Sequence, residues 1–183
     1  MSSTSNIIAN LAGSLGSIQR LITYSSWIMG LTFLMKGVMS LKHVGESKSH
    51  MSGGHNSLKE PVFYLVSGTM LAYLPTAIKV FLTTIFGSND LLAYSGINSV
   101  NPVFETLFGS SSQFGKNIVL FVQTFGLIAF IRGWLIFARS GGQGGGHQQN
   151  TFGKALMHIG GGVLALNIVK TIQILNDTLY GTT

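Results

Sequence analysis

The chain has 183 residues, of which 46% are hydrophobic and 9% charged, whereas a soluble domain has about 25% charged residues. Four long apolar windows leave too little polar surface for a soluble helical domain. The absence of cysteine excludes disulfides, thiolate metal sites and cysteine nucleophiles. The net charge of +6 is assigned to contacts with lipid headgroups, because the basic residues lie at the ends of the apolar windows.

Residues 1–20 predict an amphipathic helix that lies at the membrane interface and runs into the first apolar window. Its apolar residues fall at steps of three and four, which places them on one helical face. Residues 1–19 contain no Lys or Arg, so we do not expect a cleaved signal peptide here. The apolar face consists of Ile7, Ile8, Leu11, Leu15, Ile18 and Ile22.

Four apolar windows have the length of a membrane-spanning helix, which takes about 20 residues. They predict an all-α integral membrane protein with four transmembrane helices in two hairpins. Pro75 is expected to end or kink the second helix, because proline lacks an N–H and clashes with the preceding turn. The windows are residues 21–41, 61–86, 117–137 and 155–175. The predicted domains are the interfacial helix 1–20, a hairpin 21–87, a connecting segment 88–116 and a second hairpin 117–183.

Short motifs recur in the same order in the two halves of the chain. Gly30-Leu31 and Lys36-Gly37 correspond to Gly126-Leu127 and Arg132-Gly133, and three further matches keep nearly the same offset. An ordered set of matches at a nearly constant offset predicts an internal duplication of the hairpin. The further matches are Gly53-Gly54-His55 with Gly145-Gly146-His147, Leu71-Ala72 with Leu164-Ala165, and Gly68 with Gly161.

The distribution of basic residues predicts the orientation. Seven Lys and Arg lie in or beside the hairpin loops 42–60 and 139–153, against four on the opposite side. By the positive-inside rule the hairpin loops are expected in the cytoplasm, with both termini and the segment 88–116 facing outward.

Four cations lie within or at the ends of the apolar windows, where each is costly and needs a reason. One explanation is snorkelling, in which the long side chain reaches the headgroups. The other is that the duplicated pair, Lys36 and Arg132, lines a polar lumen or holds lipid phosphates in an assembly. The candidate contacts are Lys36, Arg132, Lys79 and Lys170.

Small residues near the fourth window predict close helix packing, because small side chains let helix backbones approach in lipid. Packing within the hairpin and packing between subunits both fit. The candidate helix-packing residues are Gly160, Gly161, Gly162 and Ala165.

No catalytic, cofactor-binding or metal-binding residues are predicted, and an enzyme is not expected. The loop histidines His43, His50, His55 and His147 lie among Gly and Ser without nearby cysteines or a carboxylate cluster, so they are interpreted as solvated. His158 is interpreted as a packed, hydrogen-bonded side chain rather than a metal ligand.

Three stretches, Gly30–His43, Glu60–Thr76 and Lys154–Ile168, together with the duplicated plan, resemble the IcmC/DotE family of Dot/Icm (type IVB) secretion systems and the related TraQ proteins of conjugative plasmids. The resemblance implies a structural subunit of the bacterial inner membrane, without enzymatic activity. Such a multi-pass subunit would be a pilin-like or channel-forming component that moves effector proteins or DNA, and could be incorporated into an envelope-spanning channel or pilus.

The implied partners are membrane phospholipids, other subunits of the apparatus and further copies of the chain, with no sequence-specific binding of nucleic acid. The alternative is a small oligomeric membrane transporter or channel protomer unrelated to secretion, since internal repeats also occur in transporters. It is less favoured, because all five acidic residues lie in loops or at the terminus.

Overall fold

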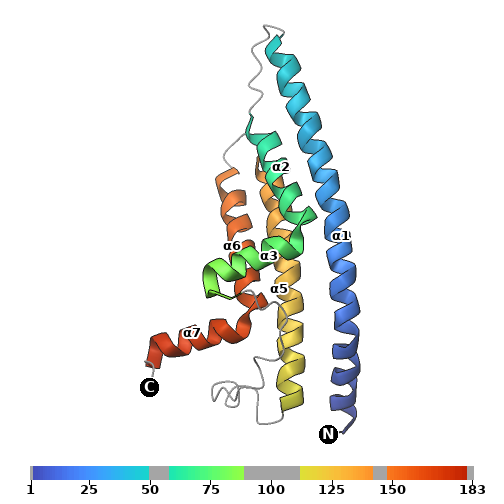
Figure 1. Cartoon of the computed structure of the whole chain (residues 1–183), viewed down its shortest axis with the longest axis vertical. Helices are drawn as coiled ribbons and strands as arrows, with labels where there is room; N and C mark the ends of the chain where they lie inside the picture. Colours follow the sequence, from blue (N-terminus) through green and yellow to red (C-terminus); the bar gives the residue numbers. More distant parts are fainter. Residues whose placement is uncertain (1, 50–57, 89–111, 142–147, 181–183) are drawn as a thin grey trace. The chain divides into compact units, whose positions relative to one another are not determined.

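The structure is a computed structural model that describes residues 2–49, 58–88, 112–141 and 148–180. Within these ranges every regular element is an α-helix, which confirms the predicted all-α class. His50, His55, His147 and most of the segment 88–116 lie outside the described residues. The helices are α1 (Ser2–Ser49), α2 (Lys59–Ala72), α3 (Leu74–Phe86), α5 (Ser112–Ser140), α6 (Gln148–Leu166) and α7 (Ile168–Tyr180) (Figure 1).

The helices belong to two compact units. Unit 1 comprises Met1–Leu21, Ile78–Ile128 and Gly161–Thr183, and unit 2 comprises Ile22–Ala77 and Ala129–Gly160. These units differ from the predicted domains, because each takes helices from both predicted hairpins.

The first helix runs into the first apolar window without a break, as predicted. α1 is one continuous helix of 48 residues, so residues 1–20 extend the first apolar window instead of forming a separate element. In unit 2 it buries a narrow stripe that includes Ser26, Gly30, Gly37 and Val44. Large apolar side chains are exposed elsewhere on α1: Ile18, Leu21, Tyr24, Trp27, Ile28, Leu31, Met35, Val38, Met39 and Leu41.

α5 contains a segment of 24 residues, Asn117–Ser140, that is long and apolar enough to cross a membrane. Among the described helices it is the single unbroken one of this kind. α1, which holds the window 21–41, does not meet the same criteria of length, hydropathy and charge. Two bent pairs, Lys59–Ala72 with Leu74–Phe86 and Thr151–Leu166 with Ile168–Leu179, raise the number to three if each pair is one span. The structure therefore supports a membrane helix, and the number of four spans remains a prediction.

Pro75 breaks the second apolar window, as predicted. α2 ends at Ala72, α3 begins at Leu74, and the two helices bend by 93° at Tyr73. The fourth window also breaks, at Asn167, where α6 and α7 bend by 91°. The second break was not predicted, because no proline stands near it. α3 ends at Phe86, and Gly87 after it forms a left-handed helix cap, with a φ of 69° and an N–H bond to the Thr83 carbonyl.

Candidate functional site

Glycines bring α1 and α2 of unit 2 into close contact. A Cβ atom on Gly30 would lie 2.4 Å from the backbone nitrogen of Ala72, and one on Gly37 would lie 2.8 Å from Cγ of Leu65. Gly68 of α2 approaches the backbone nitrogen of Leu34 in the same way, at 2.8 Å. As the residue number rises along α1 it falls along α2, so the two helices are antiparallel.

The duplicated glycines of α5 make the equivalent contact with α6. In unit 1 a Cβ atom on Gly126 would lie 2.8 Å from the backbone nitrogen of Leu166, and 2.9 Å from Cβ of Ala165. In unit 2 a Cβ atom on Gly133 would lie 2.6 Å from Cγ1 of Ile159. These helices are antiparallel too. The duplicated motif therefore has a physical meaning: two glycines seven residues apart occupy one helical face and let a second helix backbone approach.

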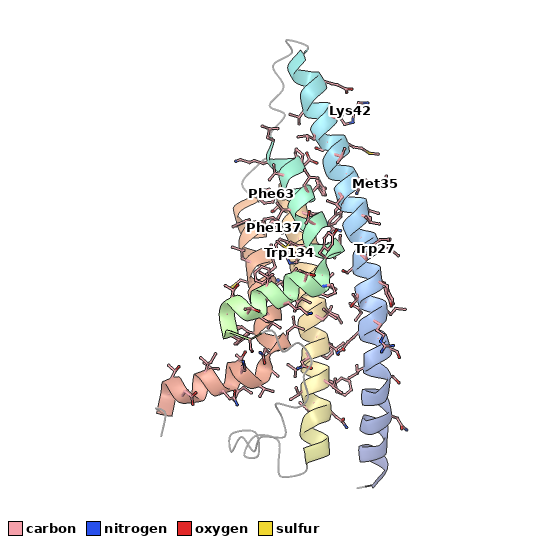
Figure 2. The ribbon with its side chains drawn as sticks, viewed as in Figure 1. Trp27, Met35, Lys42, Phe63, Trp134 and Phe137 are labelled. Carbon is pink, nitrogen blue, oxygen red and sulfur yellow. The ribbon has the colours of Figure 1, made fainter. Side chains whose placement is uncertain are left out.

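Aromatic side chains fill unit 2 between α2, α5 and α6. Phe63 stacks on Phe137 with ring centroids 4.6 Å apart, and Phe152 and Trp134 meet Phe137 at 5.6 and 5.4 Å. Figure 2 shows Phe63, Trp134 and Phe137 close together, with Trp27 and Met35 on the outer side of α1. Gly141 lies against Phe63 and Glu60, so a glycine also packs at the edge of this aromatic cluster.

The four predicted cations have different surroundings. Lys36 and Arg132, both in unit 2, are exposed, and each immediately precedes a packing glycine, Gly37 or Gly133. Both cations therefore lie beside a helix contact without being buried in it. In unit 1 Lys79 of α3 is exposed, whereas Lys170 of α7 is half-buried.

Lys170 donates a hydrogen bond to the hydroxyl of Ser88 in unit 1, which follows α3 in the chain. This bond was not predicted, because 82 residues separate the two partners. Within unit 1, Lys170 therefore links α7 to the segment that ends α3.

Both helix bends free a backbone carbonyl, and a hydroxyl group satisfies it. Pro75 has no N–H to donate to the carbonyl of Leu71, which instead accepts a bond of 2.9 Å from the buried Ser26 hydroxyl of α1. At the second bend the Thr171 hydroxyl lies within hydrogen-bond distance of two carbonyls, that of Leu164 at 2.9 Å and that of Asn167 at 3.0 Å, and shares its single proton between them. Leu71 and Leu164 are corresponding residues of the two halves.

Unit 1 also contains buried polar side chains on α5 and at the second bend. Gln19 of α1 donates to the Thr124 hydroxyl at 2.9 Å. Gln123 and Asn167 are 8% and 9% exposed, and Oε1 of Gln123 and Nδ2 of Asn167 have no hydrogen-bond partner among the described residues. Gln123 stands one turn before Gly126 on α5, and Asn167 follows Leu166, which packs on Gly126.

The predicted helix-packing residues are only partly in contact with other helices. A Cβ atom on Gly160 or Gly161 would meet nothing within 4 Å, so neither glycine packs against another helix within the described residues. Gly162 is buried, and Ala165 lies against Gly126. Packing of Gly160 and Gly161 between subunits remains a prediction. Sequence reasoning missed Gly68 and Gly141 as packing residues.

The histidines within the described ranges do not belong to a group of metal-ligating side chains. The imidazole of His158 donates from Nδ1 to the Lys154 carbonyl at 2.8 Å, which confirms the predicted hydrogen bond. His43 is exposed and lies 3.8 Å from Glu46. In residues 2–49, 58–88, 112–141 and 148–180, no three His, Cys, Asp or Glu side chains gather as they would around a metal ion.

Comparison with protein-family models, curated proteins and solved structures finds no match for this chain.

Proposed function

We propose that the chain is a structural subunit of a type IVB secretion or conjugation apparatus in the bacterial inner membrane. In this function, two hairpins supply four membrane helices, and copies of the chain assemble into a pilin-like or channel-forming component. The cargo is an effector protein or DNA. The resemblance of the three sequence stretches supports the class of apparatus, and the exposed apolar surface supports insertion in a bilayer.

The observation that carries the membrane assignment is the exposed side of α1. Trp27, Met35 and Val38 are 53%, 60% and 60% exposed, while a separate narrow stripe holds the glycines of the helix contact. A soluble monomer rarely exposes a contiguous apolar patch of this kind, whereas acyl chains solvate it without cost.

Assembly of several copies is supported by the open side of α6. Gly153 and Gly160 are seven residues apart, as are the glycine pairs of α1 and α5, yet neither meets a neighbour within 4 Å. Met157 between them is 78% exposed. This side of α6 is free to contact another subunit in the way that α1 contacts α2.

The test is co-purification of the tagged chain from native membranes, with the neighbouring proteins identified by mass spectrometry. Subunits of a secretion or conjugation apparatus among the neighbours, and loss of cargo transfer on deletion of the chain, are expected. Recovery of the chain with copies of itself alone, and normal transfer after deletion, would refute the assignment.

A transporter or channel protomer is the second candidate function. It is favoured by the two bent helix pairs at corresponding positions of the two halves, and by the buried amides of Gln123 and Asn167. Interrupted helices of this kind line substrate sites in transporters. Solute or ion flux through liposomes that contain only this chain would favour this candidate, and its absence would favour the secretion subunit.

A further inference from the structure

α7 has an apolar face and an opposite polar face. Ile168, Ile172, Leu175 and Leu179 follow each other at steps of four, three and four, which places them on one side of the helix. Leu175 and Leu179 are 55% and 73% exposed, so the apolar face is uncovered toward the C-terminal end of the helix. The opposite side carries Lys170, Gln173 and Asp177.

α3 has the same arrangement of faces. Its polar residues Thr76, Lys79 and Thr83 have the spacing of the polar residues of α7, and all three are exposed. Its apolar residues Leu74 and Ile78 are 1% and 2% exposed. The two helices that follow the two bends are therefore both amphipathic. Protein covers the apolar face of α3 at Leu74 and Ile78, but this face is open at Ile85, which is 48% exposed, much as the face of α7 is open near its end.

The helix that precedes the first bend is too short for a complete crossing. The 14 residues of α2 extend about 21 Å, compared with about 30 Å for the hydrocarbon core. The 19 residues of α6 extend about 28 Å, which is close to that thickness, so only the first bend follows a clearly short helix. An amphipathic helix in the interface is buried by about 5–10 Å, and this depth supplies the missing length.

The positions of Lys79 and Lys170 fit the burial depth of an interfacial helix. Lys79 lies on the exposed polar side of α3, and Lys170 lies on the polar side of α7. An ammonium group at the boundary of acyl chains and headgroups can reach lipid phosphates. Lys170 also donates to Ser88, but an ammonium group has three donors and can serve a phosphate as well.

We propose that α3 and α7 lie in the plane of the membrane, at the boundary between acyl chains and phospholipid headgroups. In this placement they do not complete the second and fourth spans. Leu175 and Leu179 enter the acyl region, and Lys79 and Lys170 lie at the level of the phosphates. This placement rests on the proposed function, since it requires the chain to be inserted in a bilayer.

The test measures the depth of single spin labels on the full chain, reconstituted into vesicles of phosphatidylcholine and phosphatidylglycerol. The chain has no cysteine, so each label reports one introduced site. The sites are Ile172→Cys and Leu179→Cys on α7, with Ile128→Cys and Leu135→Cys on α5 as a reference pair of equal spacing. Collision with oxygen and with a water-soluble nickel chelate gives the depth of each label.

The α5 pair is expected to differ in depth by about 10 Å, because seven residues rise about 1.5 Å each along a crossing helix. The α7 pair is expected to differ much less, with both labels just below the phosphates. A difference of about 10 Å in the α7 pair would show that α7 crosses and would overturn the placement. Equal depths near the bilayer centre, or labels fully exposed to nickel, would also overturn it.

The reference pair separates this inference from the proposed function. If the α5 labels are also fully exposed to nickel, the chain is not inserted and the proposed function fails. If the α5 pair differs as expected and the α7 pair does too, the in-plane placement alone fails.

A charge on either face of α7 gives an independent check. Leu179→Glu is expected to raise the nickel accessibility of a label at Ile172 several-fold, because the apolar face can no longer enter the acyl region. Gln173→Glu adds the same charge to the polar face and is expected to leave that accessibility unchanged. Equal responses to the two substitutions would overturn the assignment of the lipid-facing side.

Discussion

The bend between α2 and α3 and the bend between α6 and α7 are nearly equal, 93° and 91°, but different residues stabilise them. At the first, a proline removes an N–H, and Ser26 of another helix bonds to the Leu71 carbonyl. At the second there is no proline, and Thr171 of α7 itself bonds to the Leu164 carbonyl. The first bend therefore depends on contact with α1, whereas the second is held by residues close to it in the chain.

The helix contacts beside the two bends differ as well, in how closely the glycines approach the second helix. A Cβ atom on Gly30 would meet backbone atoms of Ala72 and Gly68 at 2.4–2.9 Å, whereas the contacts of Gly126 begin at 2.8 Å and include a side chain. Neither backbone atoms nor an alanine Cβ can move aside, so the shorter contact of Gly30 makes the first hairpin less tolerant of change.

The largest effect is expected for Gly30→Ala. The added methyl group should destabilise the chain by about 2 kcal/mol or more, because it forces α1 and α2 apart. Gly126→Ala should cost less, since its nearest contact, at 2.8 Å, is less severe than the 2.4 Å contact of Gly30. Thermal unfolding in detergent, followed by tryptophan fluorescence, measures both.

Gly160→Ala is the matched control for these two glycines. It adds the same methyl group at a helical position with nothing within 4 Å, so stability should be unchanged or slightly higher. Equal losses for Gly30→Ala and Gly160→Ala would contradict the assignment of the α1–α2 contact. If Gly160→Ala weakens self-association at unchanged stability, the open side of α6 is a contact between subunits.

The next effect compares the two hydroxyl groups. Ser26→Ala leaves the Leu71 carbonyl buried without a partner and should cost about 1–2 kcal/mol. Thr171→Val should cost under about 1 kcal/mol, because Thr171 is half-buried and water can replace its bond. Unfolding in detergent measures the two losses, and a larger loss for Thr171→Val would reverse the comparison.

A smaller effect is expected in a double-mutant cycle of Ser26 and Pro75. In Pro75→Ala the restored N–H can bond to the Leu71 carbonyl, so Ser26→Ala should cost about 1 kcal/mol less in that background. Thr171→Val should cost the same with and without Pro75. Additive costs for Ser26 and Pro75 would show that the serine does not serve the carbonyl freed by the proline.

The smallest effect on stability is expected for the duplicated cations. Lys36→Gln and Arg132→Gln should each leave folding almost intact, because both side chains are exposed and lose at most one weak headgroup contact of about 1 kcal/mol. The double substitution is expected to impair cargo transfer at a normal protein level. Normal transfer by the double variant would leave snorkelling as a sufficient explanation of both cations.

Part of this fold could be predicted from the sequence, because the relevant signals are local. Apolar composition and helical periodicity indicate the all-α class, and proline chemistry alone places a break near Pro75. The duplicated pairs Gly30 with Gly37 and Gly126 with Gly133 mark a repeated unit, and they are the glycines at which helices meet. The periodicity of residues 1–20 also predicted a helix that runs into the first apolar window, and α1 is one continuous helix.

Only the tertiary structure decided which side of each helix is covered. Gly160 and Gly161 have the same composition signal as Gly30 and Gly37, but they face open space, because packing depends on where a second helix lies and not on the glycine itself. The bend at Asn167 was likewise not predicted, since no proline marks it and the hydroxyl beside it, that of Thr171, bonds to the Leu164 carbonyl only in the folded structure. Ser26 meets Leu71 across 45 residues of sequence, and a contact of that range exists only when the hairpin has folded.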